Sequence, residues 1–320
     1  MSGQRRHKKG ARDKKVSRAP TLALRASTTS LPLDARGATP PLRTLHQAAA
    51  RWIGALIRMT SPHPAMTAAL DVVGRLQERP YRTNFVVLGE PGTGKAGLAR
   101  ALHQLVCPDG PLVRFNVVGF SDDDALKVLA GDGKRGGAAA AAAGGTLLIG
   151  ETAGLGPRTQ AALIRVLKTG SVDSEDDEPA RQSGRARRVC AIAMSDHDLW
   201  AEVRAGRFRH DLYWRLARIV LKLPPLRERK QDIAPAAIWM GNRILRDAGL
   251  SYELVTSDDL TRLSAAEQVN AIELKRDAIA ALEEQEWQGN LRELETVLER
   301  ALLLYRDGNA LDARAVRAAR

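Results

Sequence analysis

The residues best suited to chemistry in this sequence are a lysine and the glycines that precede it. The apolar run Phe85–Leu88 leads into a G-x-x-x-x-G-K pattern that ends at Lys95. Glycines let the backbone turn tightly, so that successive N–H groups and the start of a following helix, expected from Gly97 to Leu105, point at phosphate oxygens. The lysine would reach the outer phosphates of a triphosphate. The residues expected to hold the nucleotide are Gly89, Glu90, Pro91, Gly92, Thr93, Gly94, Lys95 and Ala96.

A second apolar run carries a carboxylate at its end. Thr146–Ile149 is followed by Gly150 and Glu151, where a strand of this kind normally presents an Asp-Glu pair to magnesium. In addition, Ala96 stands where a general phosphate loop has a Ser or Thr hydroxyl for the ion. We therefore expect ATP as the cofactor, with Mg²⁺ held weakly, and nucleotide binding and hydrolysis become separate questions.

Strand and helix signals alternate in the middle of the chain and then give way to helical signals alone. Apolar runs typical of buried strands are separated by helical periodicity, which indicates a parallel sheet wrapped by helices. These runs are Phe85–Leu88, Leu112–Val118, Thr146–Ile149 and Val189–Met194. After Arg229 the strands are expected to stop, with helical segments at about Asp232–Ala248, Ser257–Glu284 and Asn290–Arg306. The pattern predicts an α/β nucleotide-binding subdomain at residues 45–226 and a small all-helical subdomain at residues 227–320.

Five ordered motifs give the chain a family resemblance. They are Gly89–Lys95, Gly144–Leu147, Phe208–Leu216, Leu223–Arg229 and Trp287–Leu294. From about Met59 to Leu311 the sequence resembles the central AAA+ domain of sigma-54-dependent bacterial enhancer-binding transcriptional regulators. The resemblance implies a P-loop AAA+ sheet followed by a helical lid, ATP as ligand, a homo-oligomeric ring, and RNA polymerase or another transcription factor as partner.

The resemblance also implies roles for four charged side chains. Glu151 matches the residue that activates or positions the attacking water. Arg209 and Arg215 match arginines that reach the nucleotide of a neighbouring subunit and stabilise developing phosphate charge. Arg292 matches a lid arginine that senses the bound phosphate. The alternatives are a carboxylate without function at Glu151, solvated arginines on a helix face at Arg209 and Arg215, and a salt bridge from Arg292 to Glu293 or Glu295.

Two substitutions set the sequence apart from the family pattern. Gly150 replaces the aspartate that would hold the magnesium shell, and hydrolysis should slow by roughly 10² to 10³ if that placement contributes about 3 to 4 kcal/mol. Asp196 stands where the family has a sensor asparagine, which puts a carboxylate near the phosphates. This carboxylate either adds repulsion or helps to hold the metal. ATP binding should suffer less than turnover.

The segment that contacts sigma-54 in the family is also changed. Between Phe120 and Gly144 the family carries a mobile loop with a GAFTGA motif, whereas this sequence is shorter and has an alanine run from Ala138 to Ala143. A plain spacer or helix end explains the alanines, and direct remodelling of sigma-54 polymerase is not expected. Two insertions, the charged loop Ser174–Arg188 and a helical stretch around Leu260–Lys275, also depart from the family.

Most of the net positive charge lies near the N-terminus. The chain has 320 residues and a formal net charge of +12, and residues 1–58 hold thirteen Lys or Arg against two Asp, a net of +11. Residues 1–44 are predicted to form a basic disordered tail, because their Ser/Thr/Pro-rich stretch buries too little apolar surface to fold alone. The tail is either an arm that binds nucleic acid without sequence preference or a solubilising extension.

Composition argues against several other classes of protein. The two cysteines, Cys107 and Cys190, lie far apart in the sequence, and the histidines show no metal-ligand spacing, so neither a disulfide framework nor a zinc site is expected. No run approaches the roughly 20 apolar residues of a membrane span, and no signal peptide is apparent. We expect a cytoplasmic bacterial protein that does not act at a membrane.

Together these patterns favour an ATP-binding regulator of transcription with weak or absent hydrolysis that acts through nucleotide-dependent assembly. Two alternatives stay open. The first is an active AAA+ ATPase that remodels a transcription complex, in which Glu151 and Asp196 jointly rescue metal binding. The second is a nucleic-acid-associated structural protein whose P-loop domain is an ATP-tuned oligomerisation module.

Overall fold

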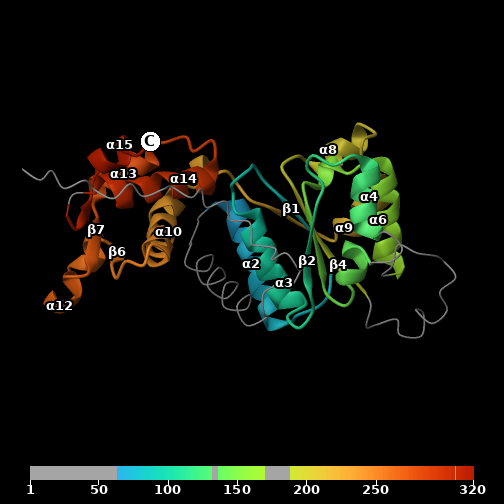
Figure 1. Ribbon diagram of the computed structural model, residues 1–320, viewed down its shortest axis with the longest axis horizontal. Coiled ribbons are helices and arrows are strands. Elements are labelled where there is room, and N and C mark those ends of the chain that lie inside the picture. Colours follow the sequence, from blue (N-terminus) through green and yellow to red (C-terminus); the bar gives the residue numbers. More distant parts are fainter. Residues whose placement is uncertain (1–62, 132–135, 170–187, 307) are drawn as a thin grey trace, which may run out of the picture. The chain divides into compact units, whose positions relative to one another are not determined.

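The computed structural model describes residues 63–131, 136–169, 188–306 and 308–320 (Figure 1). The basic tail predicted at residues 1–44 and nearly all of the charged loop Ser174–Arg188 lie outside these ranges. The described chain contains a five-stranded parallel sheet, followed by a segment with a hydrophobic core of its own.

The order of the strands brings the candidate site residues to one edge of the sheet. The strands are β1 (Phe85–Leu88), β2 (Leu112–Asn116), β3 (Thr146–Gly150), β4 (Cys190–Ser195) and β5 (Ile219–Lys222), and they run parallel in the order β2-β3-β4-β1-β5. Leu88 pairs with Ser195 on one side and with Lys222 on the other. Because the strands are parallel, the phosphate loop after β1 and the residues after β3 and β4 all leave at the same edge. The predicted α/β fold is confirmed, with one strand, β5, that the sequence patterns did not reveal.

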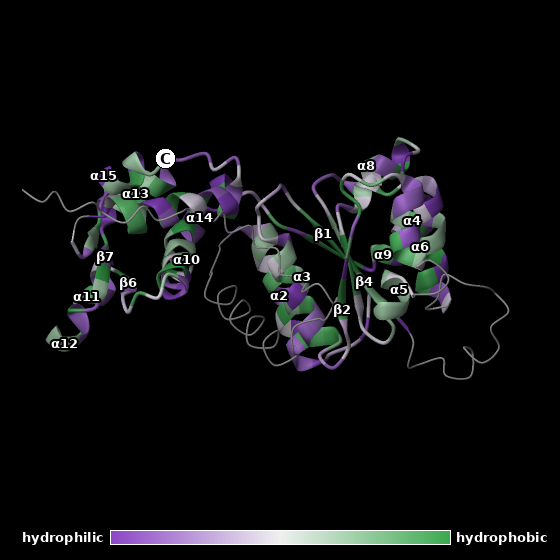
Figure 2. Ribbon diagram, in the orientation of Figure 1, coloured by the Kyte–Doolittle hydropathy of each residue, from purple (hydrophilic) through white to green (hydrophobic). Residues whose placement is uncertain are grey.

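Successive side chains of a strand point to opposite faces of the sheet, and each face has its own hydrophobic core. Phe85 and Val87 pack against α2 (Pro64–Glu78) and α3 (Lys95–Val106). Val86 instead packs with α4 (Asp122–Ala130), α6 (Pro157–Thr169) and α9 (His210–Leu216). These two sets of helices cover opposite faces of the sheet (Figure 1). Strands buried on both faces read as continuous apolar runs, and in Figure 2 the strands are largely hydrophobic while the helices show both colours. The remaining elements here are α5 (Ala138–Ala141), η1 (Thr152–Gly154) and α8 (Leu199–Arg204).

The segment after β5 forms a mainly helical lid, as predicted. Its buried core includes Ile233, Leu282 and Leu298, together with Trp287, whose indole Nε1 donates to the carbonyl oxygen of Leu282 at 2.8 Å. Its helical elements are η2 (Leu226–Glu228), η3 (Lys230–Asp232), α10 (Ile233–Asp247), α11 (Ser257–Leu260), α12 (Ala265–Gln268), α13 (Arg276–Glu283), α14 (Asn290–Arg300), a π-helical turn η4 (Ala301–Tyr305) and α15 (Ala313–Ala318).

The expectation that strands stop after Arg229, and that the lid is all-helical, is wrong. β6 (Glu253–Thr256), β7 (Ala271–Leu274) and β8 (Ala310–Leu311) form a second, three-stranded parallel sheet in the order β6-β7-β8. β7 interrupts the helix predicted over Ser257–Glu284 and also replaces part of the extra helical stretch around Leu260–Lys275. Helix capping and strand pairing together explain why a strand forms where a helix was expected. Thr256 and Ser264 cap two short helices separately, and β7 gains its pairing from strands distant in the sequence.

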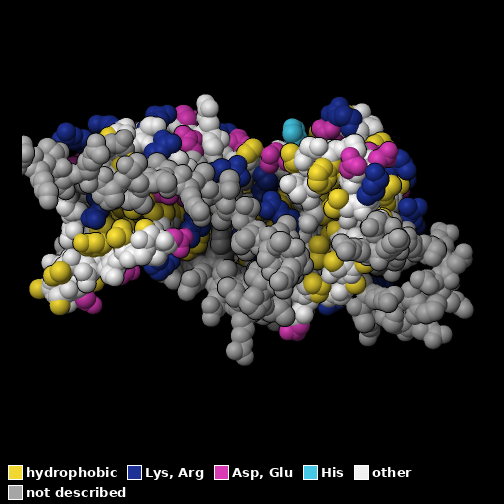
Figure 3. Space-filling model, viewed as in Figure 1, with side chains coloured by type: hydrophobic (Ala, Val, Ile, Leu, Met, Phe, Trp, Pro, Cys, Tyr) yellow, Lys and Arg dark blue, Asp and Glu magenta, His cyan; other side chains and the backbone are white. Residues whose placement is uncertain are grey.

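Charges of both signs are interspersed on the described surface in the view of Figure 3, with Lys and Arg beside Asp and Glu over the sheet and the lid. This mixture agrees with the small net charge of the sequence after residue 58. In the described ranges, no helix has both the length and the apolar character needed to cross a membrane.

Candidate nucleotide-binding site

The phosphate loop packs closely against its neighbours at two glycines. A Cβ at Gly92, where φ is +81°, would lie 2.1 Å from the carbonyl oxygen of Gly289, and one at Gly89 would lie 2.7 Å from the carbonyl oxygen of Leu223. The backbone N–H of Leu291 donates to the carbonyl oxygen of Gly92 at 3.0 Å, which joins the loop to α14. Only glycine fits where backbones approach this closely. The glycines therefore serve the packing of the loop as well as the approach of a phosphate.

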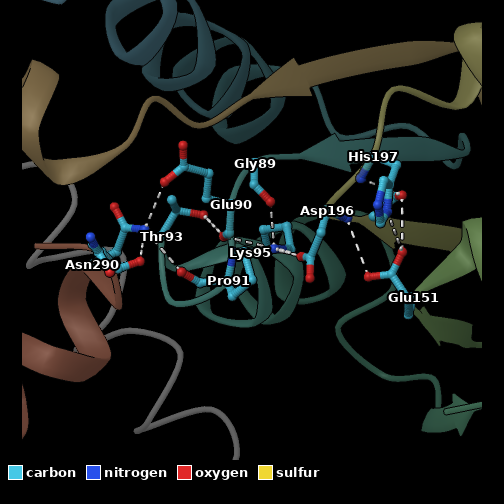
Figure 4. A network of polar contacts seen from close by, with 11 residues as sticks. Gly89, Glu90, Pro91, Thr93, Lys95, Glu151, Asp196, His197 and Asn290 are labelled. Carbon is cyan, nitrogen blue, oxygen red and sulfur yellow. Dashed lines mark hydrogen bonds and ion pairs between the residues drawn. The ribbon is translucent and has the colours of Figure 1, made fainter. Parts of the chain in front are cut away.

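Lys95 is the first residue of α3, and its side chain turns back towards the loop (Figure 4). Its Nζ donates to the carbonyl oxygens of Gly89 at 2.6 Å and of Glu90 at 2.9 Å. The third partner is the carboxylate of Asp196, with which Lys95 forms an ion pair. A lysine ammonium has three donors, so each donor has an acceptor within the protein. The structure thus brings two predicted site residues, Lys95 and Asp196, into direct contact.

Glu151 lies at the end of β3 and is held in a defined orientation. Its backbone is in the left-handed region, with φ +48°, which is uncommon for a residue other than glycine. Its carboxylate accepts hydrogen bonds from the Ser195 hydroxyl at 3.2 Å and from the Asp196 backbone N–H at 3.3 Å, and Nδ1 of His197 lies 3.7 Å away. The carboxylate is thereby aimed along the same edge of the sheet as Lys95 (Figure 4).

The residues present do not fit a magnesium ion held by the protein. Gly150 ends β3 without a side chain, and a Cβ there would lie 3.1 Å from Oδ1 of Asn116 on the neighbouring strand. Ala96 offers no hydroxyl, and the carboxylate of Asp196 is already paired with Lys95. Hard cations such as magnesium need oxygen ligands in fixed positions. A cation that accompanied a nucleotide here would be held mainly by the phosphates.

Glu90 connects the phosphate loop to two elements of the lid, η2 and α14. Its carboxylate accepts two hydrogen bonds from the guanidinium of Arg227, at 2.6 and 2.8 Å, and one from the side-chain amide of Asn290 at 3.2 Å. These bonds, led by those from Arg227, lower the pKa of Glu90 from 4.5 to about 2. Asn290 is fully buried, and its amide also donates to the carbonyl oxygen of Pro91 at 3.0 Å while its Oδ1 accepts from the N–H of Leu226 at 2.7 Å.

Arg229 is buried beside the phosphate loop and is hydrogen-bonded to its backbone. Only 3% of the residue is exposed, and one guanidinium nitrogen donates to the carbonyl oxygen of Thr93 at 2.8 Å. A second nitrogen lies 3.7 Å from the carboxylate of buried Asp232. Burial lowers the pKa of Arg229, and the neighbouring carboxylate opposes that shift. Thr93 is itself buried, and its hydroxyl donates to the carbonyl oxygen of Glu90 at 2.8 Å.

Arg292 lies on the exposed side of α14, next to the phosphate loop. A Cβ at Gly92 would be 3.4 Å from the Cβ of Arg292. The alternative of a salt bridge on the same helix is not what the described residues show, because Glu295 pairs with Arg243 and Glu293 accepts from the N–H of Gly289. The position of Arg292 is compatible with the predicted contact with phosphate, which stays a prediction.

Arg209 is the N-cap residue of α9, and Arg215 lies within that helix. Arg209 precedes the helix and forms a forked ion pair with Asp211, at 2.9 and 3.0 Å, which raises the pKa of the guanidinium. Its side chain is 51% exposed. Arg215 is partly buried, and its carbonyl oxygen accepts from the side chain of Asn84 at 2.9 Å. Among the described residues, neither arginine is hydrogen-bonded or ion-paired to the phosphate loop, so a role in nucleotide chemistry would have to be in another subunit.

Comparison with known protein families finds matches for both the sheet region and the lid. Residues 59–222 match the family described as the sigma-54 interaction domain, which is about half of the chain. The chain belongs to the sigma-54 interaction domain family. Residues 253–319 match the AAA+ ATPase lid domain. The protein is thus an AAA+ member of a family of transcriptional regulators, as the sequence motifs predicted.

The relatives of this sigma-54 interaction domain protein are longer chains. It is 32% identical over 255 residues to the Nif-specific regulatory protein of Azotobacter vinelandii, a match that covers 77% of this chain and 44% of the relative. It is 30% identical over 274 residues to the DNA-binding transcriptional activator HyfR of Escherichia coli, with 81% and 36% covered. The chain therefore spans less than half the length of these curated relatives.

Solved structures of NtrX from Brucella abortus resemble this chain in fold. The structure described as a complex with ATP has a TM-score of 0.63 and 25% identity, and the match covers 79% of this chain and 53% of NtrX. The structure described as a complex with ADP has a TM-score of 0.62 at the same identity, with 80% and 54% covered.

The family motifs explain which site residues were foreseen and which were not. Arg227 and Arg229 belong to the motif Leu223–Arg229, and Asn290 belongs to Trp287–Leu294, yet no role was predicted for any of the three. Asn290 carried one usable signal, since asparagine tolerates the left-handed backbone, and its φ is +54°. In the changed segment after Phe120, the structure places α4 and α5, and the first four alanines of the run form the short helix α5 where a plain spacer or helix end was expected.

Proposed function

We propose that this sigma-54 interaction domain protein binds ATP through its phosphate loop and regulates transcription through a change of assembly state. The observation that carries the proposal is the seating of Lys95 at the start of α3, against the loop carbonyls and at the edge where β1, β3 and β4 end. Backbone N–H groups at a helix start and a lysine form a suitable site for phosphate oxygens. The NtrX structures with ATP and ADP support the proposal by similarity.

Hydrolysis is proposed to be weak or absent. Gly150 offers no carboxylate, and Lys95 and Asp196 pair with each other. The competing proposal is a working ATPase, and the orientation of Glu151 by Ser195 and Asp196 favours it. A carboxylate held at hydrogen-bonding distance from fixed donors is suited to position a water molecule.

Assembly is proposed to involve the surface of α9. Arg209, the N-cap residue of α9, is exposed and preoriented by Asp211, and Arg215 lies within the helix. A guanidinium presented to the nucleotide of a neighbouring subunit would stabilise phosphate charge and make the contact between subunits depend on the nucleotide. This would be a ring or another homo-oligomer in which each site is completed by the next subunit.

Two kinds of partner are proposed. The family match supports an interaction with RNA polymerase or another transcription factor. The segment between Phe120 and Gly144 lacks the motif that contacts sigma-54 in the family, so this interaction would have to use another surface. The net charge of +11 in residues 1–58 supports salt-dependent binding of nucleic acid without sequence preference. An ATP-tuned structural protein on nucleic acid would use the same tail.

Calorimetric titration of the purified protein with ATP and with ADP, each with and without Mg²⁺, tests the proposed function. We expect saturable binding that is lost in Lys95→Ala, and the exposed Lys127→Ala serves as a control for the lost charge. Absence of detectable binding of either nucleotide under every condition would overturn the proposal. Phosphate release measured in the same preparation, and its loss in Glu151→Gln, separates a working ATPase from a switch without turnover.

A further inference from the structure

We propose that Asp196 competes with the nucleotide for Lys95, and that the site therefore selects a nucleotide whose phosphate charge is already neutralised by a divalent cation. The inference rests on the proposed function, because it concerns the form of nucleotide that the phosphate loop would bind. Its basis is the ion pair between Lys95 and Asp196, which joins the helix after the phosphate loop to the end of β4 (Figure 4).

The competition follows from the number of donors on Lys95. Two of its three N–H groups are bound by carbonyl oxygens of the loop itself, and the third is bound by the carboxylate of Asp196. The loop carbonyls are part of the backbone that shapes the site. A phosphate oxygen that binds Lys95 would therefore displace the Asp196 carboxylate, which is the one side-chain partner among the three.

Asp196 cannot move far when it is displaced. It directly follows β4, and its backbone N–H donates to the carboxylate of Glu151 at 3.3 Å. The preceding residue, Ser195, is fully buried, and its hydroxyl contacts Glu151 and accepts from the N–H of His197 at 3.1 Å. Rotation of the side chain can release Lys95, but the carboxylate stays close to the phosphates.

The loss of binding free energy caused by the Asp196 carboxylate depends on the negative charge of the nucleotide. Repulsion between Asp196 and the phosphates grows with the negative charge that enters the site. A divalent cation carried by the phosphates reduces that charge, and the chain itself offers little to hold the cation at Gly150 or Ala96. A neutral amide at residue 196 would offer hydrogen bonds without the repulsion. Asp196 thus penalises the metal-free nucleotide more than the metal-bound nucleotide.

The test compares ATP affinity of the wild-type chain and Asp196→Asn by calorimetry, once with excess Mg²⁺ and once with EDTA. We expect the substitution to tighten binding in EDTA by about tenfold or more, and to tighten binding in Mg²⁺ by about threefold or less. Asp196→Ala provides a second variant, and thermal unfolding of both variants confirms that they are folded. Asp258→Asn is the matched control, because it removes the same charge from an exposed ion pair with Arg276 in the lid.

Three results would overturn the inference while leaving ATP binding intact. They are unchanged affinity in both buffers, equal tightening in both buffers, and weaker binding in Mg²⁺, which would make Asp196 a ligand of the metal. Absence of binding by every variant in both buffers would instead overturn the proposed function and the inference with it.

Discussion

Glu90 and Arg227 meet in two hydrogen bonds of 2.6 and 2.8 Å, so the phosphate loop is tied to the chain beyond the sheet by a forked ion pair. The pair lowers the pKa of Glu90 from 4.5 to about 2, chiefly through the hydrogen bonds from Arg227. A carboxylate with a depressed pKa in the folded state stabilises the fold fully above the pKa of the unfolded state, and this contribution is lost as the pH falls through the folded pKa.

Glu90→Gln should therefore destabilise the protein in a pH-dependent manner. At pH 7 we expect a loss of about 1 kcal/mol in the free energy of unfolding, since the pair is partly exposed and screened by water. The difference from the wild type should shrink as the pH falls from about 4.5 to about 2. Urea unfolding at pH 7, 4 and 3 measures it, with the exposed Glu253→Gln as control. A deficit that is the same at all three pH values would contradict the explanation.

Gly92→Ala should loosen the contact between the phosphate loop and α14. The new Cβ would lie 2.1 Å from the carbonyl oxygen of Gly289, so one of the two backbones must shift. Gly119→Ala is a matched control, because its φ of +83° is close to the +81° of Gly92 and its Cβ would have nothing within 4 Å. Both variants share the strain of a left-handed residue, about 1 to 2 kcal/mol.

We expect Gly92→Ala to be less stable than Gly119→Ala by about 1 to 3 kcal/mol, which is the usual range for overpacking. Urea unfolding gives this difference, and ATP titration should show weaker binding only for Gly92→Ala. Equal stability of the two variants would mean that the close approach at Gly92 is not maintained in solution.

Gly150→Asp should raise ATP turnover by roughly 10² to 10³ if the rest of the site is organised for chemistry. The carboxylate would enter beside Asn116, whose Oδ1 lies 3.1 Å from the new Cβ and would have to move by a few tenths of an ångström. Gly150→Ala makes the same contact without a carboxylate and isolates the steric effect. Magnesium-dependent phosphate release measures the outcome. Equal turnover in the two variants would show that another element of the site limits hydrolysis.

Arg209→Ala should weaken ATP-dependent assembly without changing the ATP affinity of the isolated subunit, because the guanidinium is exposed and does not contact the phosphate loop of its own chain. Arg207→Ala is the matched control, since Arg207 forms a comparable forked ion pair with Glu202 and is exposed to a similar degree. Sedimentation velocity with and without ATP measures assembly. If the two variants assemble alike, the contact between subunits does not use Arg209.

The parts of the structure that the sequence predicted are those set by local patterns. The apolar run of β1, the glycines after it and Lys95 are contiguous, so strand, loop and helix follow from neighbouring residues. β6, β7 and β8 were missed because each is short and is stabilised by pairing with a strand far along the chain, as when Leu254 pairs with Ile272. Non-local pairing of this kind leaves little signal in a single sequence.

The difference between local patterns and non-local contacts also explains which site residues were predicted. Glu151 was predicted from its place after an apolar strand, and Asp196 from the family position of a sensor asparagine. The structure brings both together with Lys95. The contacts of Arg229 with Thr93 and of Asn290 with Glu90 span 136 and 200 residues. Such contacts depend on how the lid returns to the phosphate loop, which composition and periodicity do not determine.

The hydrogen bond from the N–H of Leu291 to the carbonyl oxygen of Gly92 has a practical consequence for mutagenesis. Both of its atoms belong to the main chain, so alanine scanning across the lid would leave this connection in place in every variant. Only a residue without an amide proton, such as proline at position 291, would remove it. A scan that found no single side chain essential for communication between nucleotide and lid would therefore be compatible with a direct mechanical link between them.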